Sequence, residues 1–215
     1  MLRYLLVNHV PLGRGKSAGT FVVGAMDVLL RRHILAARRS IRALRETGQL
    51  GYEVQLLAVG FVDIVGSTLM TARLSASELG RMLAAFEAEA FDVVLAGGGR
   101  VVKLIGDEVM FIAPDAGKAC AIAIELTRRF AAHPLVPSVR GAVAAGDVLS
   151  RDGDYFGPVV NLAARAVKVA EPGEVVVPAD ARSAAEAAGC GVRALGPTTL
   201  DGIVESVELF AVKPA

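Results

Sequence analysis

The first quarter of the chain carries an apolar pattern with helical spacing. Between Phe21 and Glu46 apolar residues recur in alternating steps of four and three, and arginines fill much of the other face. These apolar positions are Leu30, Ile34, Ala37, Ile41 and Leu44. The pattern predicts a helix that either packs on its own domain or pairs with a parallel copy of itself, and two heptads leave both open. Gly48 ends this helix, so we place a domain boundary near residue 50. Residues 1–50 are then an N-terminal helical segment, a linker or the remnant of a regulatory domain.

Beyond that boundary, residues 51–215 alternate between short branched apolar runs and longer helical patterns. Ser75 and Glu78 have the spacing of a capping box, which marks a helix start. The predicted elements are a strand at 54–62, a helical stretch opening at 66–68, the helix from 75, strands at 100–105 and 108–112, a helix from 114, a strand at 138–148, a helix at 159–169, a strand at 174–177, a helix at 179–188 and a strand at 206–212. Strand, helix, strand, strand, helix, strand is the order of a ferredoxin-like palm (βαββαβ). We therefore expect an α+β fold with extra strands and a helix at its C-terminal end.

Composition narrows the classes of function. Hydrophobic residues make up 53% of the chain and charged residues 21%, which is typical of a globular protein with a core. The net charge of +1 provides no basic field for nucleic acid. Two cysteines, Cys120 and Cys190, are too few for a disulfide framework, and we expect Cys120 to be a buried, inert thiol. The apolar run from Ala18 to Leu30 contains Asp27 and is too short to span a membrane, so we expect a cytoplasmic protein without a membrane span.

Two aspartates occupy the ends of predicted strands. Asp63 ends the first strand just before Gly66, and Asp107 lies in the tight turn between the second and third strands. In a palm these strands are neighbours, so both carboxylates can meet at one end of the sheet. Such oxygen ligands suit Mg²⁺ or Mn²⁺, and two ions can clamp the attacking and leaving oxygens of a phosphoryl displacement. The segment from Ile64 to Thr68 adds backbone N–H groups for a polyphosphate. Ordinary turn and capping chemistry also explains either aspartate alone.

Three segments resemble the motifs of class III adenylyl cyclases, in the order of that family. Residues 61–68 (FVDIVGST) resemble its first metal motif, and residues 102–110 (VKLIGDEVM) resemble its second. Residues 154–165 (DYFGPVVNLAAR) resemble its transition-state segment. The match covers roughly residues 54–213, and the spelling of the last motif is most similar to a bacterial subgroup frequent in actinobacteria.

The resemblance implies conversion of ATP to 3′,5′-cyclic AMP and pyrophosphate with two Mg²⁺ or Mn²⁺ ions per active site. Asp63, Asp107 and the Ile64 carbonyl would hold the metals. Lys103 would bond the adenine ring, and Asp154 would accept from its exocyclic amine, which is a donor and acceptor pair that fits adenine.

The third motif supplies the remaining roles by the same resemblance. Asn161 would position the ribose, and Arg165 would stabilise the charge that builds on the α-phosphate. Members of the family pair head to tail, so the resemblance implies a homodimer in which one subunit supplies the metal aspartates and the other supplies the remaining site residues.

Two alternatives stay open. The chain can be a cyclase that prefers GTP or accepts either purine, or it can be a catalytically silent nucleotide-binding or dimerisation module. Glu108 follows Asp107 directly, and we expect its side chain to point away from the metal site rather than act as a third ligand.

Overall fold

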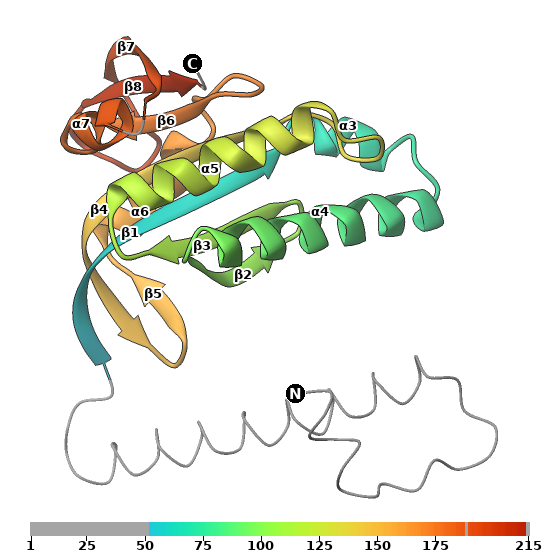
Figure 1. Ribbon diagram of the computed structural model, residues 1–215, viewed down its shortest axis with the longest axis horizontal. Coiled ribbons are helices and arrows are strands. Elements are labelled where there is room, and N and C mark those ends of the chain that lie inside the picture. The colour runs from blue at the N-terminus through green and yellow to red at the C-terminus, as the bar shows by residue number, and fades with distance from the viewer. Residues whose placement is uncertain (1–51, 188, 214–215) are drawn as a thin grey trace, which may run out of the picture. The chain divides into compact units, whose positions relative to one another are not determined.

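The computed structural model describes residues 52–187 and 189–213, and in this part of the chain eight strands form one sheet with helices on both faces (Figure 1). The helix expected at residues 21–46 and the boundary expected near residue 50 lie outside the described residues. The elements are β1 (Tyr52–Ile64), α3 (Ser67–Thr71), α4 (Ala76–Ala96), β2 (Arg100–Ile105), β3 (Glu108–Ala113), α5 (Ala116–Ala131), β4 (Val139–Arg151), β5 (Asp154–Phe156), α6 (Pro158–Ala166), β6 (Val175–Pro178), α7 (Ala179–Ala187), β7 (Gly191–Thr198) and β8 (Val207–Lys213).

The palm predicted from the order of elements is confirmed. Strands β2, β3, β1 and β4 lie side by side in that order, and each neighbouring pair is antiparallel. Strand β6 then joins β4 in parallel, and the pairs β6–β8 and β7–β8 extend the sheet. Strand β1 is central, and it is longer than its apolar run because every residue from Tyr52 to Ile64 pairs with β4.

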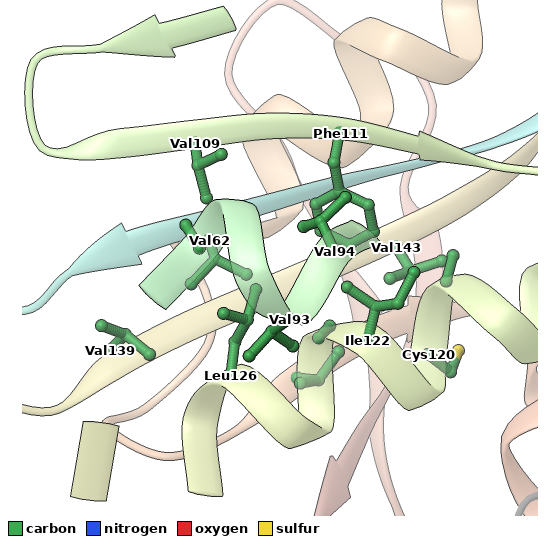
Figure 2. Packing of buried hydrophobic residues seen from close by; sticks show 14 of the residues in the cluster. Val62, Val93, Val94, Val109, Phe111, Cys120, Ile122, Leu126, Val139 and Val143 are labelled. Atoms are coloured by element: carbon green, nitrogen blue, oxygen red, sulfur yellow. The ribbon is translucent and has the colours of Figure 1, made fainter. Parts of the chain in front are cut away.

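Alternation along β1 sends its side chains to two separate cores. Ala58, Val62 and Ile64 pack on one face of the sheet, with α4, α5 and α7. Val59 and Phe61 pack on the other face, where α6 lies. Figure 2 shows part of the first core, in which side chains of the strands meet those of α4 and α5. The labelled members are Val62, Val93, Val94, Val109, Phe111, Cys120, Ile122, Leu126, Val139 and Val143.

Helix starts follow local side-chain chemistry. The predicted capping box is present: the Ser75 hydroxyl accepts from the Glu78 amide, and the Glu78 carboxylate accepts from the Ser75 amide. Helix α5 starts at Ala116 rather than at Pro114, because the Asp115 carboxylate accepts from the Lys118 amide at 2.8 Å and caps the helix.

Three parts of the prediction need correction. Strand β5 is a three-residue partner of β4 and was not expected, and β7 was not expected either because its Gly and Pro residues interrupt any alternation. Helix α6 ends at Ala166 instead of continuing to Val169. Cys120 is buried as predicted, and burial raises the pKa of its thiol to about 12. No helix in the described part of the chain is long and apolar enough to cross a bilayer.

Candidate functional site

A row of three charged side chains crosses the sheet at one end of the palm. Asp63 of β1 lies directly opposite Glu108 of β3 on one side and opposite Arg140 of β4 on the other. Residues opposite each other in antiparallel strands point to the same face. Asp63 shares that face with Val59 and Phe61, so the row faces α6.

Asp63 is held by two cations. Its Oδ2 atom accepts hydrogen bonds from Arg140 Nε at 3.2 Å, Arg140 Nη2 at 3.0 Å and Lys168 Nζ at 3.0 Å. Arg140 Nη1 also donates to the Lys168 carbonyl oxygen at 3.1 Å, which ties the arginine to the chain just beyond α6. These contacts offset the cost of burying the Asp63 side chain, which is 6% exposed.

Asp107 lies at the same end of the palm as Asp63. The Ile64 amide donates to the Asp107 carbonyl oxygen at 3.1 Å, and this bond joins the end of β1 to the β2–β3 turn. Within the described residues, no hydrogen bond or ion pair involves the Asp107 side chain. The backbones of both residues therefore lie at the same end of the palm, and in the described part of the chain the Asp63 carboxylate is paired whereas the Asp107 carboxylate is not.

The orientation predicted for Glu108 is wrong. Because Glu108 pairs with Asp63 across the β1–β3 ladder, its side chain points toward the carboxylates and not away from them. Its Oε1 atom is buried without a hydrogen bond, and Lys168 Nζ lies 3.8 Å away. Burial raises the pKa of Glu108, and the charges of Asp63 and Asp107 raise it further against the lowering effect of Lys168.

The donor set fits a hard divalent cation. Asp63, Asp107 and Glu108 place three carboxylates at one end of the sheet, and a buried acceptor without a hydrogen bond favours a cation. No group of three His, Cys, Asp or Glu side chains in residues 52–187 and 189–213 is close enough to form a complete ligand set. A metal at this site therefore needs further oxygens, from the backbone or from a bound phosphate.

Fewer backbone N–H groups are available beyond β1 than expected. The amides of Ile64 and Val65 donate to Asp107 and Ser138 at 3.1 and 3.0 Å, so they do not reach a phosphate. Gly66 has φ of 73° and turns the chain into the short helix α3. Of residues 64–68, which were predicted to donate backbone N–H groups to a polyphosphate, those at the start of α3 still can.

The two residues expected to contact adenine lie together. Lys103 Nζ donates to Asp154 Oδ2 at 2.6 Å, and the Tyr155 amide donates to Asp154 Oδ1 at 2.8 Å. Partial burial alone raises the pKa of Asp154, but these two hydrogen bonds bring the pKa below its ordinary value. Both side chains keep about a third of their surface exposed, so a ligand can still reach them.

A second contact explains why Asp154 reaches Lys103. Arg100 Nη2 donates to Tyr155 Oη at 2.6 Å, and the guanidinium lies 5.4 Å from the Tyr155 ring centre. Arg100 and Lys103 belong to β2, whereas Asp154 and Tyr155 belong to β5, whose partner strand among the described residues is β4. The β4–β5 hairpin is thus joined to β2 by side chains, across strands that separate β2 from β4.

Asn161 and Arg165 lie on the same side of α6. Gly157 precedes this helix and Pro158 is its first residue, which is a favourable start because proline lacks an N–H. Both side chains are exposed, and among the described residues neither takes part in a hydrogen bond or ion pair. The structure therefore presents them outward.

Sequence reasoning missed Arg140 and Lys168. Arg140 had a usable signal, since it interrupts the apolar residues of a strand, and a charge there requires a buried partner. Lys168 had none, because it lies in an ordinary turn after α6.

The palm, with acidic residues at the end of β1 and in the β2–β3 turn, defines the fold of a class III nucleotidyl cyclase catalytic domain. The structure is similar to that of the adenylyl cyclase CyaB from P. aeruginosa, with a TM-score of 0.68, 24% identity and coverage of 77% of this chain and 97% of that chain. This agreement confirms the predicted fold class.

Within that class the sequence is similar to adenylate cyclases of actinobacteria. It is 46% identical to the adenylate cyclase of Streptomyces coelicolor over 121 residues, which covers 56% of this chain and 32% of that protein. It is 44% identical to the adenylate cyclase of Glutamicibacter nicotianae over 122 residues, which covers 57% and 30%. The matched part spans about a third of the length of these relatives. No protein-family model matches the chain. The resemblance expected from the three motifs is confirmed.

Proposed function

We propose that the chain is an adenylyl cyclase that converts ATP to 3′,5′-cyclic AMP and pyrophosphate. The observation that carries this proposal is the meeting of Asp63 and Asp107 at one end of the palm, joined by the bond between the Ile64 amide and the Asp107 carbonyl. In the reaction, the ribose 3′-oxygen forms a bond to the α-phosphorus, and the bond from that phosphorus to the β-bridging oxygen breaks. The 3′-hydroxyl proton passes to solvent, and pyrophosphate leaves.

Asp63, Asp107 and the Ile64 carbonyl would hold two Mg²⁺ or Mn²⁺ ions. When bound, the ions lower the pKa of the 3′-hydroxyl and neutralise phosphate charge. The protein supplies no nucleophile, because positioning and electrostatics carry most of phosphoryl transfer.

Arg165 and Asn161 would act on the reacting part of the nucleotide. A guanidinium is permanently charged and presents several donors, so Arg165 can stabilise the charge that develops on the α-phosphate. Asn161 lies one helical turn earlier on α6 and can bond the ribose with its amide. Their exposure in the single chain supports a role toward a second subunit.

Lys103 and Asp154 would select the purine. Lys103 donates one of its three N–H groups to Asp154, and the Asp154 carboxylate can accept further hydrogen bonds beyond those from Lys103 and the Tyr155 amide. The pair can therefore offer a donor to a ring nitrogen of adenine and an acceptor to its amine while staying joined. Guanine carries an acceptor where adenine carries the amine, so we propose ATP as the preferred substrate.

The active sites would be shared in a homodimer. We propose that one subunit contributes Asp63 and Asp107, and that the other contributes the adenine pair with Asn161 and Arg165. A symmetric pair then contains two whole sites, whereas a monomer contains two halves.

A silent nucleotide-binding or dimerisation module is the second candidate. The two cations on Asp63 favour it, because a metal ion would have to compete with them for this carboxylate. The remaining candidate function is a cyclase that prefers GTP or accepts either purine.

Product analysis separates these functions. The purified full chain is incubated with ATP or with GTP in the presence of Mn²⁺, and the products are identified by mass spectrometry. Cyclic AMP from ATP, with far less cyclic GMP from GTP, is expected. Comparable amounts of both products indicate relaxed preference. Nucleotide binding without any cyclic product in a dimeric preparation would reject the enzyme proposal and leave the silent module.

A further inference from the structure

One lysine lies between two carboxylates at the end of the palm. Lys168 Nζ is 3.0 Å from Asp63 Oδ2 and 3.8 Å from Glu108 Oε1. Asp63 and Glu108 are 6% and 13% exposed, whereas Lys168 is 53% exposed. The nearer carboxylate accepts three hydrogen bonds at its Oδ2 atom, and the farther one has a buried oxygen without a hydrogen bond. The ammonium group therefore has a second position within about one ångström of movement.

Arg140 does not share this freedom. It donates two hydrogen bonds to Asp63 and a third to the Lys168 carbonyl oxygen, and it is 24% exposed. The third bond also holds the Lys168 backbone beside the charged row. Of the two cations on Asp63, the lysine head group is the one that can leave while its backbone stays in place.

We propose that Lys168 is a built-in counter-ion of Asp63 that a divalent cation displaces onto Glu108. The inference rests on the proposed function, because that function brings a divalent cation to Asp63. An ion on either oxygen of this carboxylate lies within a few ångströms of the ammonium group, and like charges at that separation repel. Moving to Glu108 keeps the lysine paired and satisfies a buried acceptor.

The displacement makes Lys168 a positioning residue that sets the affinity for metal. Before metal arrives, the cations that pair with Asp63 and Glu108 in the described part of the chain are Arg140 and Lys168. The lysine limits their mutual repulsion and competes with the incoming ion. After displacement the lysine neutralises Glu108, whose Oε1 atom is buried without a hydrogen bond. The lysine thus weakens metal binding and stabilises the metal-free site.

The test measures Mn²⁺ binding to the nucleotide-free full chain by electron paramagnetic resonance of the unbound ion. We expect Lys168→Gln to tighten Mn²⁺ binding roughly two- to fivefold, which is the effect of removing a partly exposed ion pair from a ligand. Structural damage would weaken binding instead. Lys118→Gln is the matched control, since Lys118 is an exposed lysine at the start of α5, and it should leave the affinity unchanged.

A second pair of variants tests where the lysine goes. Glu108→Gln removes the receiving carboxylate and should weaken Mn²⁺ binding. The fold-loss of Mn²⁺ affinity caused by Glu108→Gln should be larger when Lys168 is present than in the Lys168→Gln background. Only a protein that still has Lys168 loses the second position of the lysine when Glu108 is replaced. Equal factors in the two backgrounds would mean that Glu108 acts only as a nearby charge, and would overturn the transfer.

The inference and the proposed function fail in different ways. Equal Mn²⁺ affinities of wild type and Lys168→Gln, with cyclic AMP still formed, overturn the displacement alone. Absence of saturable Mn²⁺ binding in both proteins also overturns it, since no ion then displaces the lysine. Absence of cyclic product in the separate assay overturns the proposed function.

Discussion

Lys103 Nζ lies 2.6 Å from Asp154 Oδ2, although the two residues belong to strands that do not pair. The contact forms because the β4–β5 hairpin is also joined to β2 by the bond between Arg100 and Tyr155. It places a donor and an acceptor side by side on a partly exposed surface, which is the arrangement that an adenine edge requires.

Reversing the charge at Lys103 should impair the use of ATP. Lys103→Glu loses the donor to the base and sets a second carboxylate against Asp154. We expect kcat/KM for ATP to fall about 10- to 100-fold, from loss of a charged hydrogen bond worth about 1.5–3 kcal/mol. Lys118→Glu controls for the change in net charge. Unchanged ATP kinetics in Lys103→Glu would reject the contact with the base.

Removing the turn carboxylate should abolish turnover and spare the fold. Asp107→Ala deletes a side chain that has no hydrogen bond within the described part of the chain. The midpoint of thermal unfolding of the variant should therefore stay within a few degrees of the wild-type value. Cyclic AMP formation should drop below detection, because the metal site loses one of its two proposed carboxylate ligands. Asp201→Ala is a control in a different turn, where the aspartate is exposed and precedes Gly202, and it should remain active. An active Asp107→Ala protein would contradict the metal assignment.

Mixed dimers test whether sites are shared. Asp63→Ala and Arg165→Ala should each be inactive alone, since every site in a homodimer then lacks one essential group. When the two proteins are mixed, half of the dimers are mixed pairs and contain one intact site each. Activity should recover to about a quarter of the wild-type value under random pairing, as follows from counting sites in a symmetric dimer. No recovery, with mixed dimers demonstrated by mass, would exclude the shared arrangement.

A buried carboxylate should anchor the C-terminal strands in a pH-dependent manner. Glu174 accepts from Arg193 Nη2 at 2.9 Å and pairs with Lys213 Nζ at 3.1 Å. Burial alone raises the pKa of Glu174, but these partners bring the pKa below its ordinary value of 4.5. A pKa lowered by folding stabilises the protein above the unfolded pKa, and that contribution disappears as the pH falls through the folded value.

Glu174→Gln should therefore lower the free energy of unfolding by about 1–2 kcal/mol at neutral pH. The difference from wild type should stay constant down to roughly pH 5 and shrink below pH 4.5, where the wild-type carboxylate gains its proton. Urea titrations of both proteins at several pH values measure this difference in the free energy of unfolding. Glu205→Gln changes an exposed glutamate and should show no such trend. A pH-independent difference would mean that the carboxylate contributes through packing alone.

The central strand should reject even one added methyl group. A Cβ atom on Gly60 would overlap the ring of Phe111, which pairs with it across β1 and β3. Gly60→Ala should cost about 1–3 kcal/mol of unfolding free energy, because a packed core adapts only in part. The smaller side chain of Phe111→Leu makes room, so the double variant should lose less than the sum of the two single losses. Additive losses would contradict the overlap.

Local sequence patterns predicted most of the fold. Branched apolar runs placed β1, β2, β3 and β4, and the pair Ser75 and Glu78 placed the start of α4. These features depend on neighbours within a few positions, so no long-range information is needed. Strands β5 and β7 escaped prediction because one is three residues long and the other is an edge strand with Gly and Pro, and both exist only through their partners.

The candidate site likewise combines features that local sequence predicts with features that only tertiary packing decides. The sequence by itself determined that Asp63 ends a strand and that Asp107 sits in a tight turn, since turn chemistry is local. Only the tertiary structure decided that Glu108 faces Asp63 and that Arg140 and Lys168 bind it, across separations of 77 and 105 residues for the two cations. Strand register sets which side chains share a face, and register depends on how whole strands pack together. No pattern within one strand contains that information.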